Sequence, residues 1–207
     1  MEILDYGSLA REVRDPDQLA REGYAFRIGE YLNFAFRVLQ KDPLSFFAFA
    51  IVSSIIASVP FLAYPAYAGF YAVADKISKN EPYTFDDFFT GFRERIGPLI
   101  LASIVVQVLV FAGMLLCVLP GLYLAIAWLF SIPFILFRAG DFWQSMEWSR
   151  KVISHNWFGF FALGLIAGIL SSLGIILCVI GLFLTLPIFH LAIYAAYKDI
   201  VGTGGKS

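Results

Sequence analysis

The nine-residue stretch GMLLCVLPG, residues 113–121, returns as GIILCVIGL at residues 174–182. The spacing between the two copies is 61 residues, and Cys117 of the first copy matches Cys178 of the second. Repetition at a fixed spacing indicates a repeated structural unit. Both copies are apolar and contain the turn-forming residues Gly or Pro, so each predicts the tip of a tight helical hairpin.

The composition is typical of a membrane protein. The chain has 207 residues, 59% of them hydrophobic and 15% charged, and its mean hydropathy is +0.76. Soluble domains are about half apolar and about a quarter charged. The net charge of −1 gives no reason to expect a nucleic-acid partner. Residues 1–23 begin with acidic groups and lack the apolar core of a signal peptide, so we expect them to form a cytoplasmic tail.

Four segments are long and apolar enough to cross a bilayer, which takes about 20 residues. They are residues 97–118, 120–137, 157–177 and 179–197. Almost no linker joins the members of each pair, and the predicted turns lie at Pro120-Gly121 and at Gly181.

A fifth apolar stretch, residues 44–74, is too long for one upright helix at about 1.5 Å per residue. Pro60 and Pro65 interrupt it, and proline ends or kinks a helix. Two short spans here would place all 15 Lys and Arg residues on one side of the membrane. The positive-inside rule therefore favours six spans with both termini cytoplasmic. A tilted or re-entrant segment remains the alternative.

An amphipathic segment precedes each pair of spans. The apolar faces are Ala25, Ile28, Leu32, Ala35, Phe36 and Leu39 in the first, Phe85, Phe88, Phe89, Phe92 and Ile96 in the second, and Phe142, Met146 and Ile153 in the third. Thr84 followed by Asp87 predicts a capping box at the start of the second segment. Helices of this kind lie in the headgroup plane of a bilayer.

The predicted fold is an all-α integral membrane protein, with six transmembrane helices arranged as three parallel repeats of amphipathic helix plus helical hairpin. The units are residues 24–78, 79–138 and 139–200 of a single membrane domain, 24–200, between tails 1–23 and 201–207. The units run parallel because each contains an even number of spans.

Four segments in this order resemble the YciC-like bacterial inner-membrane proteins and the membrane domain attached to some glycerophosphodiester phosphodiesterases. They are YPAYAGFYAVADKISKNEPYTFDDFFTGFRERIG, LPGLYLAIAWLFSIPFILF, SMEWSRKVISHNWFGFFALGLIAGIL and LPIFHLAIYAAYKDI. The resemblance implies a six-helix inner-membrane protein. Catalysis in the phosphodiesterase fusions belongs to a soluble barrel domain that this chain is too short to contain, so the resemblance implies no hydrolase activity.

The predicted spans contain no charged residue, which disfavours an ion-coupled transporter. His190 and Gln107 are the candidate intramembrane polar site. His190 is interpreted either as a gate, proton-sensitive switch or ligand contact, or as a neutral histidine hydrogen-bonded to a neighbouring helix, with Gln107 as a candidate partner. Cys117 and Cys178 are interpreted either as a disulfide on an oxidising face or as two small packing residues.

The amphipathic segments carry the candidate contacts to anionic lipid or to a membrane-associated protein partner. These are Arg93, Arg95, Arg150, Lys151, Trp143 and Trp148, and the alternative for them is a solvated surface.

No Walker loop, metalloprotease motif, nucleophile elbow or Cys/His ligand cluster occurs, so we expect no enzyme activity, no cofactor and no metal site. The leading hypothesis is a non-enzymatic protein that organises lipid or protein partners through its cytoplasmic-face amphipathic helices. The alternative is a channel or facilitator for a small or lipid-like solute.

Overall fold

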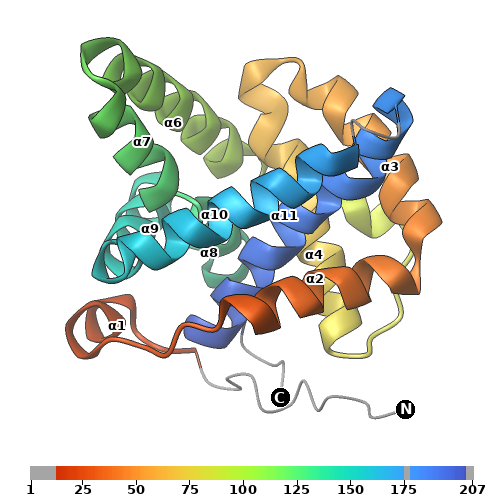
Figure 1. The fold of residues 1–207 in the computed structure, drawn as a ribbon, viewed down its shortest axis with the longest axis horizontal. Coiled ribbons are helices and arrows are strands. Elements are labelled where there is room, and N and C mark those ends of the chain that lie inside the picture. The colour runs from red at the N-terminus through yellow and green to blue at the C-terminus, as the bar shows by residue number, and fades with distance from the viewer. Residues whose placement is uncertain (1–12, 175–177, 204–207) are drawn as a thin grey trace.

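The computed structural model describes residues 13–174 and 178–203, with side chains for all of these except residues 178–180. Every regular element within these ranges is a helix (Figure 1). In chain order they are α1 (Pro16–Glu22), α2 (Ile28–Lys41), α3 (Pro43–Ala57), η2 (Pro60–Leu62), α4 (Ala63–Ser78), η3 (Phe85–Phe89), α5 (Thr90–Arg93), α6 (Ile96–Leu116), α7 (Val118–Ala127), α8 (Ser131–Arg138), α9 (Phe142–His155), α10 (Trp157–Ser172) and α11 (Cys178–Ile200).

Several of these helices are apolar enough to cross a membrane. Three stretches qualify alone, namely Ile96–Leu116, Val118–Arg138 and Gly181–Ile200. The number rises to five if the bent pairs α2–α3 and α9–α10 each count as one span. The described residues therefore form an all-α membrane protein with three to five candidate spans.

Two sharp elbows separate amphipathic helices from the apolar helices that follow them. The axes of α2 and α3 differ by 100° at Asp42, and those of α9 and α10 differ by 100° at Asn156. At each elbow a short polar side chain caps the apolar helix, because Asp42 accepts from the Ser45 N–H at 3.1 Å and Asn156 from the Gly159 N–H at 3.3 Å. The two elbow residues share similar backbone angles, φ −149° and ψ 69° against φ −134° and ψ 52°. Arg95, before α6, adopts φ −137° and ψ 30°.

The turn of the α6–α7 hairpin lies three residues before the predicted position. Cys117 is extended, with φ −169° and ψ 137°, and separates the two helices. Pro120 lies in the first turn of α7, where a missing N–H breaks no helical hydrogen bond. Gly121 lies inside α7 and permits close approach, since a Cβ on Gly113 would lie 2.9 Å from the Gly121 Cα.

The second copy of the repeated sequence forms an equivalent contact. Gly181 also lies inside a helix, α11, and not at the predicted turn. A Cβ on Gly174 would lie 2.1 Å from the Gly181 carbonyl oxygen. In both copies the glycines therefore serve helix packing at the hairpin tip.

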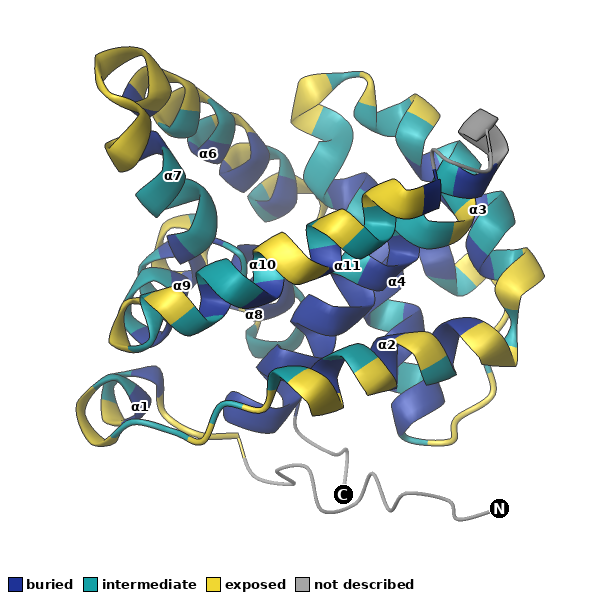
Figure 2. Ribbon diagram, in the orientation of Figure 1, coloured by how far each residue is buried: buried dark blue, intermediate teal, exposed yellow. Residues whose placement is uncertain are grey.

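Helices α4 and α11 form the centre of the molecule, and Figure 2 shows both largely in the colour of buried residues. In the most apolar window of each helix, 67% of the residues of Gly181–Ile200 are buried, against 28% for Ile96–Leu116. The α6–α7 tip is the most exposed part of the body, and Figure 2 shows it in yellow at the upper left.

The second amphipathic segment differs from the single predicted helix. It folds as the short 3₁₀ helix η3 followed by the single turn α5. The capping box is confirmed, with the Thr84 N–H donating to the Asp87 carboxylate at 2.7 Å. Phe88 is fully buried, whereas Phe85, on the same predicted face, is exposed. The segment packs against α4, where a Cβ on Gly69 would lie 1.9 Å from the Phe88 carbonyl oxygen.

The buried face of α2 overlaps the predicted one in part. Ala35 and Leu39 are buried as predicted, but Phe36 is exposed, and Tyr31, Phe34 and Val38 are buried as well. The reason is that α11 covers this face, and Tyr31 donates its hydroxyl proton to Asp199 at 2.8 Å.

Part of each predicted tail packs against the body. Helix α1 contacts α9, and Lys151 forms an ion pair with Asp17 at 2.6 Å. The Arg14 N–H donates to the Val201 carbonyl at 2.8 Å, which ties the segment before α1 to the end of α11.

Candidate functional site

Polar side chains line the contact between α4 and α11. We call them the polar seam and define it as Tyr67, Tyr71, Asp75 and Ser78 of α4 with His190, Tyr194 and Lys198 of α11. All except Tyr67 are buried. Buried polar groups need hydrogen-bond partners, so the seam fixes how the two helices pack.

Asp75 is the centre of the seam. The Tyr194 hydroxyl donates to its carboxylate at 2.7 Å, and Lys79 forms an ion pair with it at 2.7 Å. Ser78 and Tyr194 share a hydrogen bond of 3.0 Å. Lys198 is 6% exposed and feels the attraction of Asp75 and the repulsion of Lys79. The carboxylate thus joins two polar groups, the Tyr194 hydroxyl of α11 and the Lys79 ammonium at the end of α4.

His190 lies at the apolar end of the seam among aromatic rings. Its Nδ1 is 3.4 Å from the Tyr71 hydroxyl. The rings of Tyr67 and Phe70 stack on the imidazole, with centroids 4.5 Å and 5.2 Å away. This environment suits a neutral histidine that joins α11 to α4.

A polar pocket of about 500 Å³ opens at the other end of the seam. Its walls come from α4, η3, α5, α8 and the segment after α11, and they include Asp75, Lys76, Lys79, Glu81, Asp87, Glu94 and Thr203. Lys76 bridges α4 to η3 through an ion pair with Asp87 at 2.7 Å. Burial opposes ionisation of Asp87, but hydrogen bonds from Lys76 and Thr84 outweigh it and hold the pKa of Asp87 below its ordinary value.

The sequence analysis missed this pocket and the seam residues around Asp75. The sequence does contain a signal that could have found these residues, namely the spacing of polar groups along one face of a helix. Tyr71 and Asp75 are four residues apart, as are His190 and Tyr194, and residues four apart share one face of a helix.

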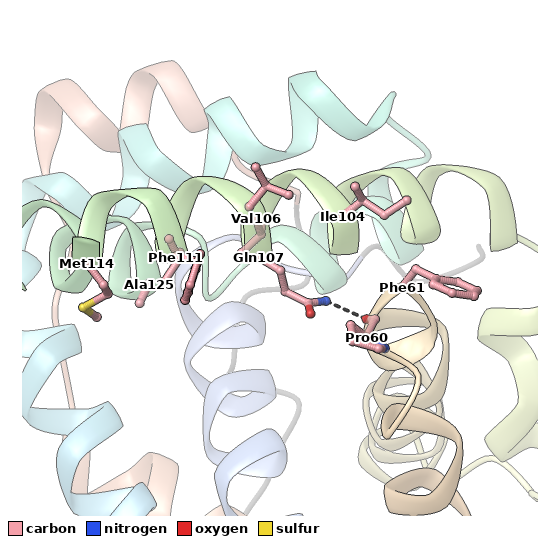
Figure 3. A pocket seen from close by; sticks show the side chains of 10 residues that line it. Pro60, Phe61, Ile104, Val106, Gln107, Phe111, Met114 and Ala125 are labelled. Carbon is pink, nitrogen blue, oxygen red and sulfur yellow. Dashed lines mark hydrogen bonds between the residues drawn. The ribbon is translucent and has the colours of Figure 1, made fainter. Parts of the chain in front are cut away.

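Gln107 does not meet His190. Its amide nitrogen donates to the Pro60 carbonyl at 2.6 Å and to the Ser103 hydroxyl at 2.8 Å, as Figure 3 shows for the Pro60 bond. Ser103 also donates to the Pro60 carbonyl, at 2.9 Å. Gln107 therefore joins the turn between α3 and α4 to the middle of α6.

Gln107 also lines an apolar groove of about 760 Å³ (Figure 3). The other walls are Pro60, Phe61, Ile104, Val106, Val108, Val110, Phe111, Met114 and Ala125. Gln107 is the one residue of this lining with a polar side chain.

Three of the four basic residues predicted to contact lipid or a partner are held in ion pairs. Arg93 pairs with Asp86, Arg150 with Glu147 at 2.6 Å, and Lys151 with Asp17, whose pKa that contact lowers. These intramolecular pairs favour a solvated surface at all three positions.

Arg95 and the two tryptophans lie in three different environments. Arg95 is the residue directly before α6 and forms no ion pair within the described residues. Trp143 is 57% exposed on α9. Trp148 instead packs inward, with the Arg138 guanidinium 5.3 Å from its ring centroid and the Phe134 ring 5.7 Å away.

Of the two candidate disulfide residues, one has a described side chain. Cys117 is an exposed free cysteine at the α6–α7 tip. The side chain of Cys178 lies outside the described residues. Among the described residues, no cluster of three or more His, Cys, Asp or Glu side chains has the geometry to hold a metal ion.

No family model and no solved structure matches the chain. An uncharacterized protein of Mycobacterium bovis is 27% identical over 137 residues, which cover 66% of this chain and 41% of that protein. An uncharacterized protein of Mycobacterium tuberculosis is 26% identical over 137 residues, which again cover 66% of this chain and 41% of that protein. The match thus spans about two fifths of these curated relatives, and their names assign no activity.

Proposed function

We propose that the chain is a non-enzymatic, multi-pass protein of the bacterial inner membrane that organises lipid or protein partners through α2, η3–α5 and α9 at its cytoplasmic face. The 100° elbows before α3 and α10 carry the proposal. A helix that turns by about a right angle before an apolar helix suits a position along the membrane surface.

The first residues after the elbows support this orientation. Leu44 is 74% exposed and Phe158 is 79% exposed, each two residues after its elbow, and Ile96 is 41% exposed directly after Arg95. Exposed apolar side chains beside these polar residues suit the boundary between headgroups and hydrocarbon. We propose that the two elbows and Arg95, the residue before α6, lie at one level, the cytoplasmic interface.

A six-span topology with three parallel repeats follows from this placement. In it, α3 and α4 are short spans of 15 and 16 residues, or about 23 Å each at about 1.5 Å per residue. The similar backbone angles of Asp42, Arg95 and Asn156, each directly before an apolar helix, and the glycine contacts at two hairpin tips support three repeats. The resemblance to YciC-like proteins is part of the same proposal.

Labelling with a membrane-impermeant maleimide on intact cells tests the topology. We expect labelling at native Cys117, and none at Lys79→Cys in a chain whose own cysteines are replaced. Labelling of the position 79 cysteine from outside, to the same extent as in permeabilised cells, would contradict the six-span arrangement.

Lipid-dependent stability tests the function. Trp143 is exposed and Arg95 is half-buried, and no ion pair occupies either side chain within the described residues. We expect phosphatidylglycerol to raise the Tm of the protein in nanodiscs by about 2–4 °C over phosphatidylcholine, which corresponds to about 1 kcal/mol. The double variant Trp143→Ala, Arg95→Gln should lose most of this difference. The control variant Gln144→Ala, at an exposed position of α9, should keep it. An equal Tm in both lipids would reject lipid organisation by this face.

The alternative, a channel or facilitator for a small or lipid-like solute, requires an open path through the bundle. The aromatic rings packed around His190 favour the organiser over this alternative. Solute flux through reconstituted protein, abolished by His190→Phe, would reverse that preference.

A further inference from the structure

The apolar groove beside α6 exists because the first hairpin is short. The turn after α3 ends against the middle of α6, where the Pro60 carbonyl accepts from Gln107 and Ser103. Beyond this contact the far half of α6 packs against α7 but leaves large apolar side chains exposed, with Phe111 66% exposed and Leu116 84% exposed. The groove lies between that half of α6, the Pro60 turn and α7.

The orientation of Gln107 leaves one unused acceptor in the groove. A carbonyl oxygen only accepts hydrogen bonds, so the amide nitrogen of Gln107 must face Pro60, as Figure 3 shows. The amide oxygen, Oε1, accepts no hydrogen bond from any described residue. In hydrocarbon an acceptor without a donor is costly, so the occupant of the groove gains by supplying an O–H.

We propose that this groove binds a neutral lipid of the bilayer that has a long aliphatic chain and a free hydroxyl, with the hydroxyl donating to Gln107 Oε1. The apolar walls select the chain, and the absence of charged residues among the lining residues selects a neutral molecule. The volume of about 760 Å³ lies in the range of small-molecule sites, about 300–1,000 Å³. The site goes beyond the proposed function, because η2, α6 and α7 line it and none of the interfacial helices does.

A matched pair of lipids tests the hydroxyl. The purified protein in detergent is given dioleoylglycerol and its 3-O-methyl ether, which has the same chains and no donor, and native mass spectrometry measures the bound fraction of each. We expect a preference of about threefold to tenfold for dioleoylglycerol, the range of one net hydrogen bond. Gln107→Leu should abolish the preference, and Gln144→Leu, on the exposed face of α9, should leave it unchanged.

A second variant tests the groove and does not depend on Gln107. Ala125→Phe places a ring among the lining residues and should reduce binding of both lipids to the background of a detergent-solubilised unrelated protein. Equal binding of the two lipids by the wild-type protein, or a preference that survives Gln107→Leu, would overturn the hydroxyl contact. Unchanged binding in Ala125→Phe, or a dimer that this substitution dissociates, would overturn the lipid as occupant. Neither result depends on the outcome of the lipid-dependent Tm measurement with the Trp143 and Arg95 variant.

Discussion

The polar seam and the α6–α7 hairpin use opposite kinds of side chain. In the seam, buried polar groups pair across two helices, as Asp75 does with Tyr194. In the hairpin, large apolar side chains such as Phe111 and Leu116 are exposed, and two glycines hold the helices together. Water around the hairpin would disfavour its exposed apolar surface, whereas a bilayer around it stabilises that surface.

The contrast also indicates where specificity resides. Between lipid and protein, apolar surfaces gain little from burial, so close packing and hydrogen bonds decide which helices meet. The seam supplies the hydrogen bonds, and the hairpin tips supply the close packing. Substitutions in each region test the two sources of specificity separately.

The largest effect is expected from deleting a buried ring. Phe130 is fully buried, with ring centroids of Phe160 and Tyr197 at 5.0 Å and 5.3 Å. Phe130→Ala should lower the free energy of unfolding in detergent micelles by about 3–5 kcal/mol. Phe111→Ala, at an exposed position, should change it by less than about 0.5 kcal/mol. Similar losses for the two variants would contradict the packing of the hairpin.

The next effect concerns the centre of the seam. Asp75→Asn removes the negative charge that Lys79 contacts at 2.7 Å, and we expect a loss of about 1–3 kcal/mol. Asp86→Asn is the matched control, because the Asp86–Arg93 pair is exposed to solvent and its loss should have a smaller effect. Denaturant titration of both variants measures the difference. If Asp75→Asn were as harmless as its control, the seam would not hold α4 against α11.

A third prediction separates two glycines of one helical hairpin. A Cβ on Gly174 would clash with the Gly181 carbonyl, so Gly174→Ala should destabilise the protein by about 1–3 kcal/mol. Gly168, in α10, has no atom within 4 Å of the corresponding Cβ position. Gly168→Ala should therefore stabilise the helix by about 0.5–1 kcal/mol. Thermal unfolding of the two variants in the same detergent shows whether each substitution lowers or raises the stability of the protein.

The local features of this fold follow from the sequence. The apolar lengths predicted the hairpins, and Thr84 with Asp87 predicted the capping box that forms. The third amphipathic segment, expected over residues 141–155, forms α9 over Phe142–His155. Helix α1 had a readable signal as well, since Asp15 caps it and Pro16 occupies its first position.

The contacts between distant segments do not follow from the sequence. Nothing local to Gln107 indicates that its partner is the Pro60 carbonyl, 47 residues away. Phe36 was placed on the wrong face because α11 covers the face of α2 that carries Tyr31, Phe34 and Val38. The turn near Pro120 was misplaced because proline ends one helix as readily as it begins the next. Asp75 and Lys198 look like charges at span ends, and only the packing of α4 on α11 buries them.

The smallest expected effect depends on pH and concerns the wall of the polar pocket. Asp87 joins η3 to α4 through Lys76, and its folded-state pKa is lower than in an unfolded chain. The stabilisation it supplies is therefore complete above the unfolded pKa, about 3.9, and is lost as the pH falls through the folded value. We expect Asp87→Asn to cost about 1 kcal/mol at pH 7 and progressively less below about pH 4. Unfolding free energies of both chains at pH 7 and at about pH 3 measure this, with Lys76→Met as the variant that removes the partner. A cost that stayed constant with pH would assign the effect of Asp87 to the shape of the turn and not to its charge.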